Sequence, residues 1–266
     1  MVSCGQLYPA RDLERKLTIN GVERSYLLHI PPGLDSTRSA PLLLAFHGAG
    51  DDPAEMQLLT GFNEIADQSG FIVVYPAGIG QSWNAGGKCC GEALKENIDD
   101  VAFVRQLLSD LETVVRVDPK RLYATGFSNG GAFADRLACE MSDIFAAVAS
   151  VAGILSYSPC QPQQPVSVMH VHGMADFILP YGGGGGFEIR PVEEIMSSWA
   201  ELDGCVDSPA VDNSIKTIKH IAYSSCQAGT TVELYALEGT GHAWPSKDVW
   251  DTSQKIWDFF AAHPKE

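Results

Sequence analysis

The chain has 266 residues, of which 45% are hydrophobic and 19% are charged, a balance typical of a globular enzyme with a large buried core. Its formal net charge of −15 repels phosphate backbones, so nucleic acid is not an expected partner. No apolar run approaches the roughly 18 residues that a membrane-spanning helix needs, so we expect a soluble protein without a membrane partner.

The N-terminal part of the chain predicts an antiparallel hairpin. Residues 17–19 and 25–30 read as strands, and they flank Asn20-Gly21, a strong signal for a two-residue turn. Pro31-Pro32-Gly33 ends this hairpin.

Apolar strands and amphipathic helices alternate after the hairpin. Continuous apolar strands in repeated strand–helix units predict a mostly parallel sheet with helices on both faces. We see no linker, so residues 1–266 are expected to form one α/β catalytic domain without a large cap domain. Glycines make residues 76–97 a long predicted loop and residues 182–186 a predicted surface turn, although the sequence does not show whether the latter acts as a lid. In chain order we expect strands over 42–47, 71–75, 121–126, 145–151, 166–172, 217–223 and 231–237, and helices over 54–69, 98–115, 129–141, 191–202 and 249–262.

Seven cysteines suggest an oxidising compartment and a disulfide framework. Two pairs are expected, each closing a loop of about 22 residues. Either Cys89 or Cys90 is expected to hold the N-terminus through Cys4, which leaves one thiol over. No Cys or His cluster has the spacing of zinc ligands, so we expect neither a metal nor a cofactor. The two expected pairs are Cys139 with Cys160 and Cys205 with Cys226.

The segment Gly126-Phe127-Ser128-Asn129-Gly130 lies between a predicted strand and a predicted helix. A G-x-S-x-G motif in this context is a nucleophile elbow, a sharp turn that needs small residues on both sides of the serine. Ser128 would then lie at a helix N-terminus, where the dipole favours developing negative charge. We therefore predict that Ser128 is a catalytic nucleophile.

A nucleophilic serine needs a base, and that base needs an orienting carboxylate. In proteins where a nucleophile elbow carries the serine, the three residues follow along the chain in the order Ser, Asp, His. Asp176 lies just after the strand over 166–172, at the carboxyl edge of the sheet. His242 lies in a glycine-flanked loop before the last helix. His170 and His172 lie on a strand before Asp176, where a core or hydrogen-bonding role is expected. Asp176 and His242 are therefore the predicted acid and base.

The tetrahedral intermediate of acyl transfer requires an oxyanion hole. The backbone N–H of Asn129, directly after the nucleophile, is the first expected donor. The second is expected from His47-Gly48-Ala49-Gly50, after the strand over 42–47, with the Ala49 N–H as the candidate.

These motifs together resemble the secreted esterase family that includes feruloyl esterases, acetyl xylan esterases and polyhydroxybutyrate depolymerase-like proteins. The resemblance spans almost the whole chain and keeps the motif order. It implies an α/β-hydrolase fold, the same catalytic triad and similar disulfides. The matching pieces are HGAG (47–50), SWNAG (82–86) with Cys89-Cys90-Gly91, IDDVAFV (98–104), VDPKRLYATGFSNGGAF (117–133), HGMADFILPY (172–181) and GTGHAWP (239–245).

Aromatic residues near the motifs suggest how a substrate is bound. Trp83, Phe127 and Trp244 are the predicted substrate-binding residues, while Phe177 and Tyr181 follow Asp176. A feruloyl ester of plant cell-wall polysaccharide is the leading expected substrate, ahead of acetylated xylan and polyhydroxyalkanoate. An acyltransferase and a non-catalytic binding protein of the same fold are the alternatives from other classes. Met1-Val2-Ser3 leads straight into Cys4, which with the cysteine content predicts a secreted protein, extracellular or periplasmic, without its export signal. A monomer is the expected oligomeric state.

Overall fold

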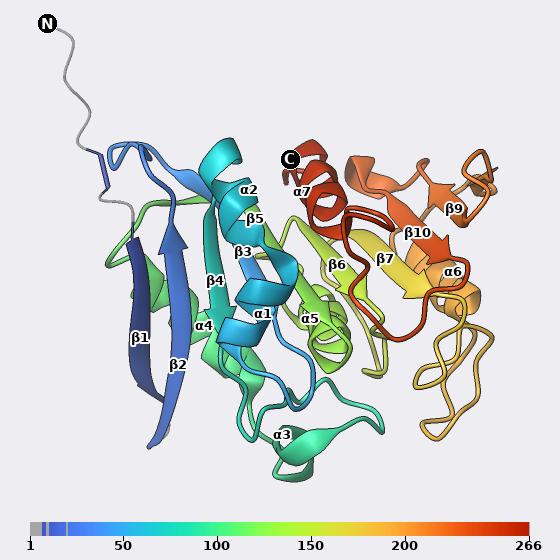
Figure 1. Cartoon of the computed structure of the whole chain (residues 1–266), viewed down its shortest axis with the longest axis horizontal. Helices are drawn as coiled ribbons and strands as arrows, with labels where there is room; N and C mark the ends of the chain where they lie inside the picture. The colour runs from blue at the N-terminus through green and yellow to red at the C-terminus, as the bar shows by residue number, and fades with distance from the viewer. Residues whose placement is uncertain (1–6, 9–10, 20, 266) are drawn as a thin grey trace, which may run out of the picture.

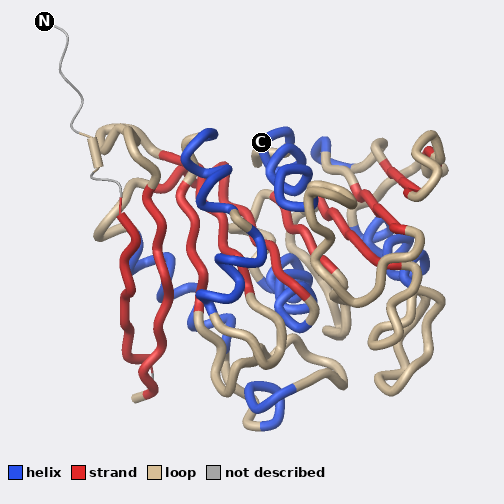
Figure 2. The backbone as a smooth tube through the Cα atoms, in the orientation of Figure 1, coloured by secondary structure: helices blue, strands red, loops and turns tan. Residues whose placement is uncertain are grey.

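A ten-stranded mixed sheet runs through the molecule in the order β1-β2-β4-β3-β5-β6-β7-β10-β9-β8 (Figures 1 and 2). The computed structural model describes residues 7–8, 11–19 and 21–265. The central strands from β4 to β10 in this order pair in parallel, whereas both edges of the sheet pair antiparallel. This arrangement confirms the predicted mostly parallel sheet. The strands are β1 (Arg11–Ile19), β2 (Val22–Ile30), β3 (Ala40–Phe46), β4 (Ile72–Pro76), β5 (Val117–Phe127), β6 (Ala147–Val151), β7 (Ser167–Gly173), β8 (Ala210–Asp212), β9 (Ile218–Tyr223) and β10 (Val232–Leu237).

Helices cover both faces of the sheet, as Figure 1 shows. Helices α4, α5 and α6 pack their apolar residues into a core on one face, and α1, α2 and α7 pack into a second core on the opposite face. Because every residue of β3 is buried between these two cores, the strand is apolar throughout. No helix in the described part of the chain combines the length and apolarity needed to cross a membrane. The helices are α1 (Pro53–Thr60), α2 (Phe62–Ser69), α3 (Gly91–Lys95), α4 (Asp100–Leu111), α5 (Asn129–Glu140), α6 (Val192–Leu202) and α7 (Thr252–Ala262), with a 3₁₀ turn at Gln227–Gly229.

The single helix expected over 54–69 is wrong, because the structure has two helices that meet at Gly61. Gly61 has a φ of 61°, and its N–H donates to the Gln57 carbonyl to cap α1. Glycine adopts this left-handed conformation at little cost, so it ends one helix and allows the next to start. Asp52 and Glu55 begin α1 with a capping box.

Two further elements differ from the prediction. The expected loop over 76–97 contains the short helix α3, and β8 adds an exposed strand of three residues at the sheet edge. An exposed strand this short has no apolar alternation that a sequence pattern could reveal. The predicted N-terminal hairpin is confirmed, since Ile19 of β1 pairs with Val22 of β2, while Asn20 of its turn lies outside the described residues.

Three disulfides are present among the described residues. Two of them are the expected Cys139–Cys160 and Cys205–Cys226 pairs. The third joins Cys89 to Cys90, so the expectation that one of them pairs with Cys4 is wrong. The physical reason is that the two adjacent thiols bond to each other, which leaves neither of them available. Cys4 itself lies outside the described residues.

Candidate active site

Ser128 occupies a tight turn between β5 and α5. Its φ of 53° and ψ of −116° are unusual for a residue with a side chain, and its N–H donates to the Val151 carbonyl at 2.8 Å. A Cβ on Gly126 would lie 2.3 Å from the Gly130 carbonyl carbon, and one on Gly130 would lie 2.2 Å from the Phe46 oxygen. The G-x-S-x-G spacing is therefore a steric requirement of this turn.

His242 links Ser128 to Asp176. Its Nε2 lies 2.9 Å from the Ser128 Oγ, and its Nδ1 lies 2.7 Å from Asp176 Oδ2. The Asp176 carboxylate can only accept a hydrogen bond, so Nδ1 carries the proton and the Nε2 lone pair faces the serine. This is the arrangement in which a histidine takes the proton of a serine hydroxyl. The structure thus brings the three predicted residues together.

Asp176 is buried and held from both sides of its carboxylate. Oδ1 accepts the N–H groups of Ile178 and Leu179, each at 2.8 Å, while Oδ2 faces His242. The Asp176 side chain has no solvent exposure, and that of His242 is 9% exposed. Three charge-assisted hydrogen bonds therefore fix the carboxylate that orients the histidine.

The loop after β7, which carries Asp176, meets the loop after β10, which carries His242. β7 and β10 are neighbouring parallel strands, so their carboxyl ends lie side by side. The Ala175 N–H donates to the Thr240 carbonyl at 2.9 Å. A Cβ on Gly173 would lie 2.2 Å from that same carbonyl oxygen, so only glycine allows this approach.

The two predicted oxyanion donors, the N–H groups of Ala49 and Asn129, are free to bind an acceptor. The N–H groups of Ala49 and Asn129 have no acceptor among the described residues, and Asn129 is the first residue of α5, where N–H groups are free. The Asn129 side chain is fixed because it accepts from the Trp83 N–H at 2.7 Å and donates to the Trp83 carbonyl at 3.1 Å. The role of the Ala49 and Asn129 N–H groups in holding an oxyanion stays a prediction.

His47 stabilises the loop that carries Ala49. Its Nδ1 donates to the Gly48 carbonyl at 2.8 Å, and its Nε2 accepts from the Gly78 N–H at 3.0 Å. Burial lowers the pKa of His47, which favours this neutral form. Since the Gly48 carbonyl and the Ala49 N–H belong to one planar peptide, the first hydrogen bond also orients the predicted oxyanion donor.

Two of the three predicted substrate-binding aromatic residues lie in the protein core. Trp83 is completely buried, stacks on Phe133 with ring centroids 5.3 Å apart, and donates its Nε1–H to the His47 carbonyl. Trp244 is 7% exposed and donates its Nε1–H to Ser253. The expectation that they bind substrate is therefore corrected. Large aromatic side chains contribute most by burying their area, and both indole donors are already paired.

Phe127 and three apolar residues near Asp176 remain accessible. The half-buried Phe127 ring lies 5.2 Å from the His242 ring, measured between centroids. Met174, Phe177 and Ile178 are exposed to 37%, 82% and 42%. Met174 and Ile178 were not among the predicted residues, although their positions beside Asp176 in the sequence could have indicated them.

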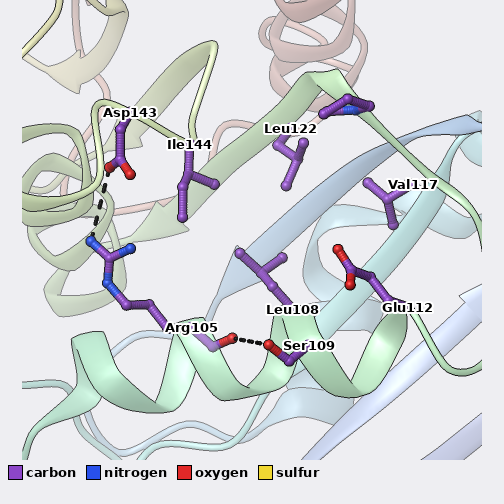
Figure 3. A pocket seen from close by; sticks show the side chains of 9 residues that line it. Arg105, Leu108, Ser109, Glu112, Val117, Leu122, Asp143 and Ile144 are labelled. Carbon is purple, nitrogen blue, oxygen red and sulfur yellow. Dashed lines mark hydrogen bonds and ion pairs between the residues drawn. The ribbon is translucent and has the colours of Figure 1, made fainter.

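A pocket of about 390 Å³ lies away from these residues (Figure 3). It is lined by Arg105 and Leu108 of α4 and by Val117 and Leu122 of β5, and Arg105 faces Asp143 across it at 3.9 Å. Val117 begins β5 whereas Ser128 follows its last residue, so the pocket lies at the opposite end of that strand. Among the described residues, no three His, Cys, Asp or Glu side chains are grouped to hold a metal.

Comparisons with known proteins show what this chain is similar to. Residues 24–213 match the family model described as esterase PHB depolymerase. The chain is 30% identical over 245 residues to feruloyl esterase B of Piromyces equi, covering 86% of this chain and 44% of that protein. It is 31% identical over 258 residues to feruloyl esterase C of Emericella nidulans, covering 92% and 85% respectively. The chain thus spans less than half the length of the Piromyces equi relative.

A solved structure shows the same fold. The acetyl xylan esterase from Aspergillus awamori superposes with a TM-score of 0.66 at 16% identity, over 94% of this chain and 99% of that one. At this identity the likeness supports the α/β-hydrolase fold and not a shared substrate.

Proposed function

This chain belongs to the esterase PHB depolymerase family, and we propose that it hydrolyses carboxylic esters with Ser128 as nucleophile, His242 as base and Asp176 as orienting acid. The observation that carries the proposal is the continuous hydrogen-bonded path from Ser128 Oγ through His242 to Asp176. A serine, an imidazole and a buried carboxylate in this order are the groups that acyl transfer requires.

The proposed reaction has two acyl-transfer steps. His242 Nε2 takes the Ser128 proton as Oγ attacks the ester carbonyl, and Asp176 stabilises the imidazolium that forms. The Ala49 and Asn129 N–H groups hold the oxyanion. His242 then protonates the leaving alcohol, and water attacks the acyl-enzyme with His242 again as base. As the acid leaves, His242 returns to Ser128 Oγ the proton that it took from the water, so the cycle consumes one ester and one water.

A feruloyl ester is the proposed leading substrate. Two relatives are named feruloyl esterases, and the Phe127 ring beside His242, with the exposed apolar side chains that flank Asp176 in the sequence, could contact an aromatic acyl group. Phe127 lies beside the base and Phe177 follows the acid directly, so these two replace the buried tryptophans as candidate contacts. Acetylated xylan is the second candidate, favoured by the name of the solved Aspergillus awamori neighbour.

The proposed setting is extracellular, with residues 1–266 acting as one catalytic domain on an ester of plant polysaccharide. The disulfides Cys139–Cys160 and Cys205–Cys226 support the oxidising compartment. The continuous sheet from β1 to β8 supports the single domain. A monomer stays the expected oligomeric state.

Initial rates on methyl ferulate, acetylated xylan and a 3-hydroxybutyrate oligomer test the proposal, with Ser128→Ala as the control. We expect the highest kcat/KM on methyl ferulate and no measurable turnover in the variant. A preference for acetyl or hydroxybutyrate esters would keep the triad and reject the proposed substrate. Turnover that survives in Ser128→Ala would reject the mechanism itself.

A further inference from the structure

Two buried histidines on β7, His170 and His172, lie next to the proposed triad and have no part in the steps above. Side chains two residues apart on a strand point to the same face of the sheet, so both rings lie on the side of α5 and α6. They are 2% and 1% exposed, and their rings stack with centroids 5.3 Å apart. A buried polar group needs a hydrogen-bond partner, and the partners of these rings lead to Asp176.

The hydrogen bonds of His172 have a defined direction. Its Nε2 lies 2.8 Å from the Leu179 carbonyl oxygen and 3.4 Å from Asp176 Oδ2, and both of these atoms can only accept. His172 Nε2 therefore carries a proton. Its Nδ1 lies 3.0 Å from His170 Nε2, so in the neutral ring Nδ1 accepts the proton that His170 donates.

These contacts hold the Asp176 loop at two points. The Leu179 carbonyl accepts from His172, while the Leu179 N–H donates to Asp176 Oδ1. The backbone of Leu179 thus fixes one side of the Asp176 carboxylate. On the other side, Oδ2 lies 2.7 Å from His242 Nδ1 and 3.4 Å from His172 Nε2. Loss of the His172 nitrogen would release the loop that orients the acid.

His172 can fill this role because it stays neutral. Burial lowers the pKa of both His172 and His170. The titratable groups that face His172 are His170 from its own strand, Asp176 and Tyr181 from the following loop, and His242 from the loop after β10. While His172 is neutral, the negative charge of Asp176 stabilises the His242 imidazolium alone. A charged His172 would compete with His242 for that carboxylate.

We propose that His172 is a positioning residue that holds Asp176 toward His242, and that His170 fixes the tautomer of His172 that does so. The proposal rests on the proposed ester hydrolysis by Ser128, His242 and Asp176.

The test compares three variants on a p-nitrophenyl ester. His172→Phe keeps an aromatic ring, slightly larger than imidazole, and removes both nitrogens, and His172→Gln keeps a donor near the Nε2 position. His220→Phe is the matched control, because His220 bonds to Glu233 and stacks on Tyr235, away from the triad. A small misplacement of a reacting group costs up to about 10²-fold in rate, so we expect His172→Phe to lower kcat by about 10- to 100-fold with KM unchanged. His172→Gln should recover most of that loss, and His220→Phe should keep the wild-type kcat.

The proton resonance of His242 Nδ1 is the second measurement. This proton lies in the hydrogen bond to Asp176, so it should shift or disappear in His172→Phe and stay in place in His220→Phe. If His172→Phe does not fold, His170→Phe replaces it. His170→Phe removes only the donor to His172, and it should lower kcat several-fold and shift the same resonance.

The outcomes separate the two proposals. Wild-type kcat and an unshifted His242 resonance in His172→Phe, or in His170→Phe where that variant is used, would overturn the positioning role while Ser128→Ala remains inactive. Equal losses in His172→Phe and His220→Phe would also overturn it, because general destabilisation would then explain the effect. Turnover in Ser128→Ala would instead reject the proposed function.

Discussion

Single side chains at the candidate site are constrained on several sides at once. Ser128 keeps an unusual backbone conformation because glycines at 126 and 130 remove the atoms that would collide. Asp176 accepts three hydrogen bonds, from His242 and from two backbone N–H groups. Each residue therefore has neighbours that fix its position before a substrate arrives, which is what electrostatic preorganisation requires.

Asp176→Asn should lower kcat on a p-nitrophenyl ester by about 10³- to 10⁴-fold. An amide can donate toward His242 Nδ1, which favours the tautomer with the proton on Nε2 and leaves no lone pair for Ser128. Asp143→Asn is the control, because Asp143 is 44% exposed and lies 3.9 Å from Arg105. A loss of less than ten-fold in Asp176→Asn would contradict the role proposed for Asp176.

Gly130→Ala should lower the free energy of unfolding by about 1–3 kcal/mol, because its Cβ would overlap the Phe46 and His47 carbonyl oxygens. Gly182→Ala is the matched control, since its Cβ would meet no atom within 4 Å and its φ is not positive. Urea denaturation of both variants measures the difference. Equal stabilities would show that the turn can relax around the added methyl group.

Among the helices, α5 connects Ser128, the proposed nucleophile, to the disulfide framework. The helix begins directly after Ser128 and carries Cys139 near its end. Cys139 is joined to Cys160, in the segment between β6 and β7. The disulfide therefore ties the C-terminal end of α5 to the segment between β6 and β7. At the N-terminal end of α5, the hydrogen bond from the Ser128 N–H to Val151 holds the chain to β6.

Replacing Cys139 and Cys160 together by serine should cost about 2–4 kcal/mol of unfolding free energy, because the unfolded chain regains the entropy of the open loop. Cys205 and Cys226 have the same separation of 21 residues, so their double replacement provides the comparison. We expect similar losses in chemical denaturation and unchanged kcat well below the melting temperature. A loss below 1 kcal/mol for either pair would contradict the chain-entropy estimate.

The whole molecule combines a formal net charge of −15 with buried acids that resist ionisation. Burial raises the pKa of Asp135 to about 8 and that of Asp203 to about 7. Burial outweighs the opposing hydrogen-bond effect of Ser150 on the Asp135 pKa, so the neutral form of Asp135 is the one that fits α5. Because these acids keep a proton that the unfolded chain gives up, their contribution to stability falls as the pH rises from about 4 to about 8.

Between pH 7 and pH 9 the unfolding free energy should therefore decrease. The buried histidines do not oppose this decrease, because their lowered pKa affects stability only below about pH 6.5. Asp135→Asn removes one titrating acid and should reduce the decrease, as measured by urea denaturation at both pH values. An identical decrease in the variant would show that Asp135 does not cause it.

From the amino-acid sequence alone we could predict the alternation of strands and helices, the tight G-x-S-x-G turn, the three residues that the fold brings together as the proposed triad, and two of the disulfides. These features depend on local periodicity, on glycine spacing and on chain order, which a single sequence displays. Phe127 was expected to bind substrate because it precedes Ser128 in the sequence, and the fold places its ring beside His242 as well. The break of a predicted helix at Gly61 was missed, since apolar spacing continues across the glycine.

Which side chains the core encloses depends on contacts between distant parts of the chain. Trp83 lies in the family motif SWNAG and Trp244 lies two residues after His242, yet packing against Phe133 and Phe62 buries them. His172 was expected to have a core or hydrogen-bonding role, and its particular partner, the Asp176 loop, follows from the way the turn after β7 folds back onto the strand. Burial and hydrogen-bond partners depend on residues that are distant in the chain, and for that physical reason they followed from the fold and not from the motifs.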